Sequence, residues 1–68
     1  MPVVNVQVWK GISEEYVKKI ISGITDVFVN IGIPRQAVEV IIQEIPKEHW
    51  GVNGKPATES LPDEKPPT

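Results

Sequence analysis

The sequence contains no cysteine and a single histidine, His49, among its 68 residues. The lack of cysteine excludes a disulfide framework and a thiolate-bound metal. One histidine also disfavours a nitrogen-rich metal site, so we expect no metal. A chain this short buries a limited share of its surface, and small scaffolds without disulfides or metals are usually stabilised by oligomerisation. We therefore expect a single domain that associates with copies of itself.

The sequence also lacks any apolar run that approaches the roughly 20 residues of a membrane span. It shows no signal-peptide pattern, because a charged first region is missing and the first apolar stretch alternates with polar residues. The formal net charge is −2, and an acidic chain without a basic patch is a poor partner for nucleic acid. These absences predict a soluble cytoplasmic protein with neither membrane nor nucleic-acid partners.

Residues 2–9 alternate in a way that is typical of a β-strand. Successive side chains of a strand point to opposite faces, so every second residue shares a face. The face able to cover a core carries Pro2, Val4, Val6 and Val8. The opposite row is mixed, so it can meet solvent or another subunit. Proline is tolerated at the start of a strand because its missing N–H need not break a ladder hydrogen bond.

Residues 14–31 have the pattern of an amphipathic helix. Ser13 is a good N-cap and two glutamates follow it, where the helix dipole favours anions. The apolar side chains recur at helical spacing. They are Val17, Ile20, Ile21, Ile24, Val27, Phe28 and Ile31. We interpret this stripe as core, and the residues between its members, Thr25 among them, as lying off it. Gly32 and Pro34 are expected to end the helix.

A second strand is predicted over residues 37–45, which are rich in β-branched side chains. Strand, helix and strand of these lengths make a βαβ unit with parallel strands and a right-handed crossover. Two strands and one helix leave an edge and a face uncovered, which again favours association. Asn53-Gly54 suits a tight hairpin turn with positive φ. We divide the chain into a domain of residues 1–57 and a proline-rich, flexible tail of residues 58–68.

Several of these features resemble the 4-oxalocrotonate tautomerase family. They are Met-Pro before an alternating strand, Gly11-x-Ser13-x-Glu15, Val38-Glu39-Val40-Ile41-Ile42-x-Glu44 and His49-Trp50-Gly51-x-x-Gly54. The resemblance extends over residues 1–57. It implies an α+β fold, in which a β-α-β protomer with a C-terminal hairpin turn assembles as dimers into a hexamer. It also implies a cofactor-independent isomerase, which moves a proton in a 2-oxo or 2-hydroxy-enoic acid substrate.

The resemblance assigns the central role to Pro2, which becomes the N-terminal residue once Met1 is removed. It also places Trp50 in an apolar wall of the active site. Two positions depart from the family pattern, because Ile12 and Glu39 stand where well-studied members carry substrate-binding arginines. These departures count against a dicarboxylate substrate. A catalytically inactive binding or structural protein with the same fold is therefore the alternative to an active tautomerase.

The chemistry expected of Pro2 is that of a general base. A secondary amine is mostly protonated in neutral water, but burial disfavours the charged form and so lowers an amine pKa. A base works best when its pKa is near the working pH. The substrate oxygens still need a cation or hydrogen-bond donor, for which Lys10 and Arg35 are candidates. Lys10 is about 27 Å from Pro2 along an extended strand, so it must act on the proline of a neighbouring subunit.

Overall fold

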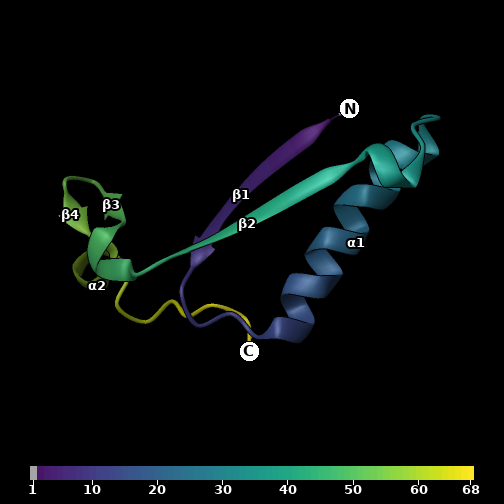
Figure 1. Cartoon of the computed structure of the whole chain (residues 1–68). Helices are drawn as coiled ribbons and strands as arrows, with labels where there is room; N and C mark the ends of the chain where they lie inside the picture. The colour runs from purple at the N-terminus through teal and green to yellow at the C-terminus, as the bar shows by residue number, and fades with distance from the viewer. Residues whose placement is uncertain (1) are drawn as a thin grey trace.

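Residues 2–68 are described by the computed structural model, and their main sheet has two strands. β1 (Val3–Trp9) and β2 (Glu39–Ile45) run parallel, in a register that pairs Val3 with Glu39 and Trp9 with Ile45. Helix α1 (Glu14–Asn30) connects them, as Figure 1 shows. The predicted β-α-β topology is therefore confirmed. This topology places the starts of both strands and the C-terminal end of α1 at one end of the sheet. The C-terminal ends of both strands lie at the other end.

The predicted start of the second strand was wrong by two residues. Ala37 belongs to a short 3₁₀ turn, η1 (Arg35–Ala37), and the strand begins at Glu39. The N–H of Ala37 donates to the carbonyl of Pro34 at 2.9 Å, and that of Val38 donates to Arg35 at 3.2 Å. These hydrogen bonds satisfy the backbone locally, so the β-branched composition of the segment does not extend the strand into it.

The two faces of the main sheet differ in exposure, as the alternation of β1 predicts. Side chains at the even positions of β1 are half-buried, and so are their neighbours Val40 and Ile42 in β2. The opposite face carries Val3 at 53% exposure and Ile41 at 48%. Residues 2–68 of a single chain therefore leave one face of the sheet uncovered, with apolar side chains on it.

Both ends of α1 are capped as the sequence predicts. The hydroxyl of Ser13 accepts a hydrogen bond from the N–H of Tyr16 at 3.3 Å. At the other end Gly32 has a φ of +101°. Its N–H donates to Val29 at 3.0 Å, and that of Ile33 donates to Phe28 at 3.1 Å. This pair of bonds is a Schellman motif, which glycine favours because it has no Cβ to resist a positive φ.

The apolar stripe predicted on α1 is displaced in the structure. Thr25, expected to lie off the stripe, is 8% exposed, whereas Val27 and Ile31 are 59% and 71% exposed. The hydroxyl of Thr25 donates to the carbonyl of Ile21 at 2.7 Å, and a buried polar group needs such a partner. Apolar periodicity alone could not reveal that this threonine is buried and satisfies its hydroxyl within the helix.

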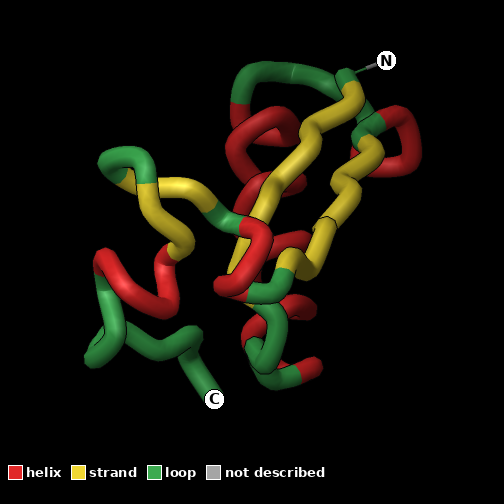
Figure 2. The backbone as a smooth tube through the Cα atoms, turned by 90° about the vertical axis from the view of Figure 1, so that its left-hand side faces the viewer, coloured by secondary structure: helices red, strands yellow, loops and turns green. Residues whose placement is uncertain are grey.

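A separate, short hairpin follows the main sheet. After η2 (Lys47–His49), β3 (Gly51–Val52) pairs antiparallel with β4 (Lys55–Pro56). The two residues of the turn, Asn53 and Gly54, have φ values of 55° and 80°. This confirms the predicted tight turn, because a two-residue turn with both φ values positive is of type I′. The hairpin stands apart from the main sheet in both views (Figure 1 and Figure 2).

The C-terminal segment folds back along the molecule. A short helix, α2 (Ala57–Ser60), begins at a fully buried alanine. Residues 61–68 then continue without a regular strand or helix and return to the start of α1 (Figure 1). There the carbonyl of Pro67 accepts a hydrogen bond from the N–H of Ser13 at 3.2 Å. The flexibility expected of residues 58–68 stays a prediction, but the structure gives this segment specific contacts with the domain.

No helix within residues 2–68 combines the length and the apolar character that crossing a membrane requires.

Candidate active site

Pro2 lies immediately before β1, at the end of the main sheet where both strands begin. It is half-buried, and its carbonyl accepts a hydrogen bond from the N–H of Glu39 at 3.0 Å. This bond attaches the residue to β2 and fixes the direction in which the chain enters the strand. Met1, whose removal would free the Pro2 nitrogen, lies outside the described residues.

Trp50 lies at the opposite end of β1. Its ring meets that of Trp9, with centroids 6.0 Å apart and planes at 80°. Pro2 and Trp9 are seven residues apart on an extended strand, which separates them by about 23 Å. The structure therefore does not bring Pro2 and Trp50 together within one chain. A site that uses both residues has to take them from different subunits.

The two candidate cations also lie at opposite ends of the sheet. Lys10 follows β1, and its N–H donates to the carbonyl of Ile45 at 2.8 Å, so it belongs to the Trp50 end. Arg35 lies in η1, just before β2, at the Pro2 end. Its guanidinium pairs with Asp26 on α1, and both side chains are exposed. An exposed ion pair contributes little free energy, so a substrate carboxylate can compete with Asp26 for Arg35.

The two positions that depart from the family pattern have different surroundings. Ile12 is 8% exposed and is one of the few buried apolar residues. Glu39 is exposed at the start of β2. The first position is therefore a buried apolar side chain, and the second is an exposed carboxylate. Neither side chain can hold a substrate carboxylate by charge.

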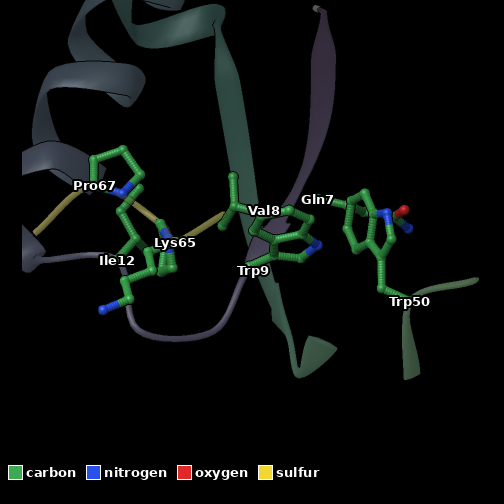
Figure 3. Close-up of a pocket in the computed structure, with 8 residues that line it drawn as sticks. Gln7, Val8, Trp9, Ile12, Trp50, Lys65 and Pro67 are labelled. Carbon is green, nitrogen blue, oxygen red and sulfur yellow. The ribbon is translucent and has the colours of Figure 1, made fainter. Parts of the chain in front are cut away.

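A cavity of about 350 Å³ lies beside Trp9, at the end of β1 where Trp9 contacts Trp50. Figure 3 shows the side chains that surround it. The lining is largely apolar and consists of Gln7, Val8, Trp9, Ile12, Trp50, Lys65, Pro66 and Pro67. Trp50 is among the residues that line this cavity, and its role at a substrate site stays a prediction. The contribution of residues 65–67 was not predicted, because a proline-rich tail carries no sequence signal for where it returns.

Lys47 connects this cavity to the C-terminal segment. Its ammonium lies 4.7 Å from the centre of the Trp9 ring, which is the distance of a cation–π contact. The same ammonium donates to the backbone carbonyls of Leu61 and Glu64, the second at 2.7 Å. Sequence reasoning missed this role because the partners are backbone atoms 14 and 17 residues further along the chain.

The indole nitrogen of Trp9 is buried and has no oxygen or nitrogen acceptor among the described residues. In Figure 3 this nitrogen lies on the side of the ring that faces Trp50. The edge-to-face arrangement of the two rings offers it the π surface of Trp50, a weak acceptor for an N–H group. Trp9 is therefore held by Lys47 as well as by Trp50, which gives this wall of the cavity a defined shape.

A metal site has no support in the described part of the chain. Residues 2–68 contain no cluster of three or more histidine, cysteine, aspartate or glutamate side chains that could hold an ion. The carboxylates near the two ends of the sheet lie apart from one another, with Glu39 at the start of β2 and Glu44 accepting a hydrogen bond from the N–H of Gly11 at 3.2 Å.

Comparison with known proteins gives consistent matches over most of the chain. Residues 2–59 match the family model described as tautomerase enzyme. A probable tautomerase of Staphylococcus aureus is 44% identical over 55 residues, which cover 79% of this chain and 90% of that protein. A probable tautomerase of Ralstonia nicotianae is 42% identical over 57 residues, covering 82% and 81% of the two chains.

The fold has solved counterparts as well. A 4-oxalocrotonate tautomerase isozyme from Methylibium petroleiphilum superimposes with a TM-score of 0.82 at 30% sequence identity, over 88% of this chain and 98% of that chain. The resemblance noted in the sequence is thus confirmed by a family model and by the three-dimensional fold. The chain belongs to the tautomerase family.

Proposed function

We propose that this protein is a cofactor-independent isomerase, which interconverts the enol and keto forms, or shifts a double bond, of a 2-oxo acid. The amino-terminal amine of Pro2 acts as the general base once Met1 is removed. The observation that carries the proposal is the family match, which begins at Pro2 and runs through the β-α-β unit and the hairpin. Family membership supports isomerase activity in general, and the role of Pro2 and the substrate class are our inference.

The proposed chemistry needs a neutral amine of fixed direction. A proline ring has few conformers, so the lone pair of its nitrogen is held in place. The hydrogen bond from Glu39 to the Pro2 carbonyl further limits how the residue can turn. The neutral amine removes a proton from the substrate enol or from the carbon next to its carbonyl, and the resulting ammonium returns a proton to another carbon. No other co-reactant is consumed.

The proposed active unit is an oligomer built from dimers, most simply a hexamer. The uncovered face of the main sheet supports association, because Val3 and Ile41 expose apolar surface there. The separation of Pro2 and Trp50 within one chain supports it independently, since only a neighbouring subunit can supply an aromatic wall to Pro2. Lys10 of a neighbouring subunit is the one that reaches Pro2, whereas Arg35 lies at the same end of the sheet as the Pro2 of its own chain.

The absence of a cation at Ile12 and Glu39 favours a monocarboxylic substrate over a dicarboxylic one. With two charged positions lost, fewer cations remain to neutralise a second carboxylate, and a buried carboxylate without a partner is costly. We therefore place the substrate among 2-oxo acids with one carboxylate, or 2-hydroxy-enoic acids of the same kind. Lys10 and Arg35 are the candidate cations for that single group.

The test combines intact mass with activity. Mass spectrometry first establishes that Met1 has been removed from the purified protein. Ketonisation of phenylenolpyruvate is then followed by absorbance for the wild type, Pro2→Ala and a form whose N-terminus is blocked by acetylation. We expect Pro2→Ala and the blocked form to lose most of the activity while keeping the oligomeric state. Rates equal to the wild type in both would refute the role of Pro2.

A catalytically inactive oligomeric protein is the second candidate. The burial of Ile12 supports it, because the chain has turned a position that carries a cation in the family pattern into part of its apolar interior. This reading predicts that a panel of 2-hydroxy-enoic acids is ketonised no faster by the processed protein than by buffer, and that the oligomer nevertheless forms. A rate that depends on Pro2 would exclude it.

A further inference from the structure

The C-terminal segment of residues 61–67 completes the cavity beside Trp9. Lys65, Pro66 and Pro67 line it together with the two tryptophans. Figure 3 shows Lys65 and Pro67 on one side and the two tryptophan rings on the other. This segment lies beyond residue 59, where the family match ends. The cavity is therefore shaped partly by a feature that this chain adds to the family domain.

Three kinds of contact fix the position of this segment. The ammonium of Lys47 donates to two of its carbonyls, and the N–H of Ser13 donates to Pro67 at 3.2 Å. The ring of Pro66 approaches Gly11 so closely that a Cβ at Gly11 would lie 3.3 Å from the Pro66 ring. Proline rings also restrict the backbone. A segment held in this way can serve as a wall, because little conformational entropy remains to be lost when a ligand binds.

The size and chemistry of the cavity indicate its occupant. An apolar cavity of about 150 Å³ is sufficient for benzene, so the 350 Å³ here has room for an aromatic ring and a short side chain. Lys65 is the one charged residue among the eight that line the cavity. Its ammonium points away from the tryptophans in Figure 3, but an exposed side chain changes rotamer within nanoseconds and can meet a carboxylate at the rim.

We infer that residues 61–67, fastened by Lys47, form a specificity wall that selects ligands with an aromatic ring and a single carboxylate. The ring lies between the tryptophans and the prolines, and the carboxylate faces Lys65. Lys47 is a positioning residue, since it acts through the segment and through the Trp9 ring. The link to catalysis rests on the proposed function, in which this cavity would bind the apolar part of the substrate of a neighbouring Pro2. Ligand binding itself needs no chemistry at Pro2.

The test measures binding with unreactive probes. trans-Cinnamate carries a ring and a carboxylate, and cinnamamide is its uncharged counterpart. Both tryptophans of the chain line the cavity, so the intrinsic fluorescence reports binding there directly. The variants are a chain that ends at Ser60, Lys47→Gln and Lys65→Gln. Lys55→Gln is the matched control, because it removes an equal charge from an exposed position in β4 that is not part of the cavity.

We expect the Kd for cinnamate to rise about tenfold, the equivalent of about 1.4 kcal/mol, in the shortened chain and in Lys47→Gln. Lys65→Gln should weaken cinnamate binding by about two- to fivefold, as befits an exposed ion pair, and leave cinnamamide unaffected. Lys55→Gln should bind both probes like the wild type. In the isomerase assay, Lys47→Gln should raise KM for phenylenolpyruvate and retain kcat, because the reacting atoms are untouched.

Wild-type affinity for cinnamate in both the shortened chain and Lys47→Gln would overturn the inference. Circular dichroism shows whether the shortened chain folds, and the point variant carries the test if it does not. Pro2→Ala separates this inference from the proposed function, because it should bind cinnamate normally. If Pro2→Ala kept full activity, the proposed function would fail, whereas the specificity wall would still be judged by the binding data alone.

Discussion

A mixture of two impaired variants should regain activity if the active site is shared between subunits. Pro2→Ala lacks the proposed base, and Trp50→Ala lacks the aromatic wall. The two positions lie at opposite ends of β1, because Trp50 contacts Trp9 at 6.0 Å between ring centroids and Trp9 is about 23 Å from Pro2. No single chain of either variant can therefore supply both residues to one site, nor can a wild-type chain do so.

The size of the recovery follows from the statistics of mixing. A functional site needs Pro2 from a Trp50→Ala subunit and Trp50 from a neighbouring Pro2→Ala subunit. When equal amounts of the variants assemble at random, each condition is met half of the time, so about one quarter of the sites in a symmetric oligomer are complete. The activity should reach about one quarter of the wild-type value, added to what the separate variants retain.

The assay is ketonisation of phenylenolpyruvate at a concentration well below KM, after the two variants have been unfolded together and refolded. The control is the same two proteins refolded separately and then combined, where subunits exchange slowly and activity should stay near the sum of the two. Light scattering checks that each sample reaches the same oligomeric state. Mixed oligomers that show no gain over this control would refute a site shared between subunits.

Three further substitutions test the fold and the assembly. Ser13→Ala should lower the free energy of unfolding by about 0.5 to 1 kcal/mol, because it removes the cap on α1, and urea denaturation measures this loss. Gly32→Ala should cost about 1 to 2 kcal/mol in the same experiment, since the positive φ strains any other residue although a Cβ there meets no neighbour. Ile41→Glu should shift the protein to smaller species in light scattering, because it charges the uncovered sheet face, whereas Ser22→Glu on exposed helix surface should not.

Local sequence signals predicted the elements of the fold well where the deciding interactions are local. The Ser13 cap, the glycine at the end of α1 and the Asn53-Gly54 turn were all confirmed, because each depends on the backbone preferences of one or two residues. Thr25 was misplaced for the opposite reason. Its burial depends on how α1 is rotated against the sheet, which periodicity gives only approximately.

Only part of the candidate site could be proposed from the sequence. Pro2 and Trp50 follow from the resemblance to the family, and the distance from Pro2 to Lys10 follows from strand geometry alone. The contacts of Lys47 with Trp9 and with the C-terminal carbonyls did not follow. They join residues that are far apart in the sequence. The C-terminal acceptors are backbone carbonyls, which every residue carries, so no residue type marks them in the sequence.

The sequence by itself determined the β-α-β unit, the caps and the turn, because these depend on periodicity and on the conformational limits of single residues. The tertiary structure alone decided that Pro2 and Trp50 lie at opposite ends of one strand pair, that Ile12 is buried, and that residues 61–67 close a cavity. These properties depend on contacts between residues that are far apart in the sequence. Local sequence patterns do not specify which distant segments come into contact.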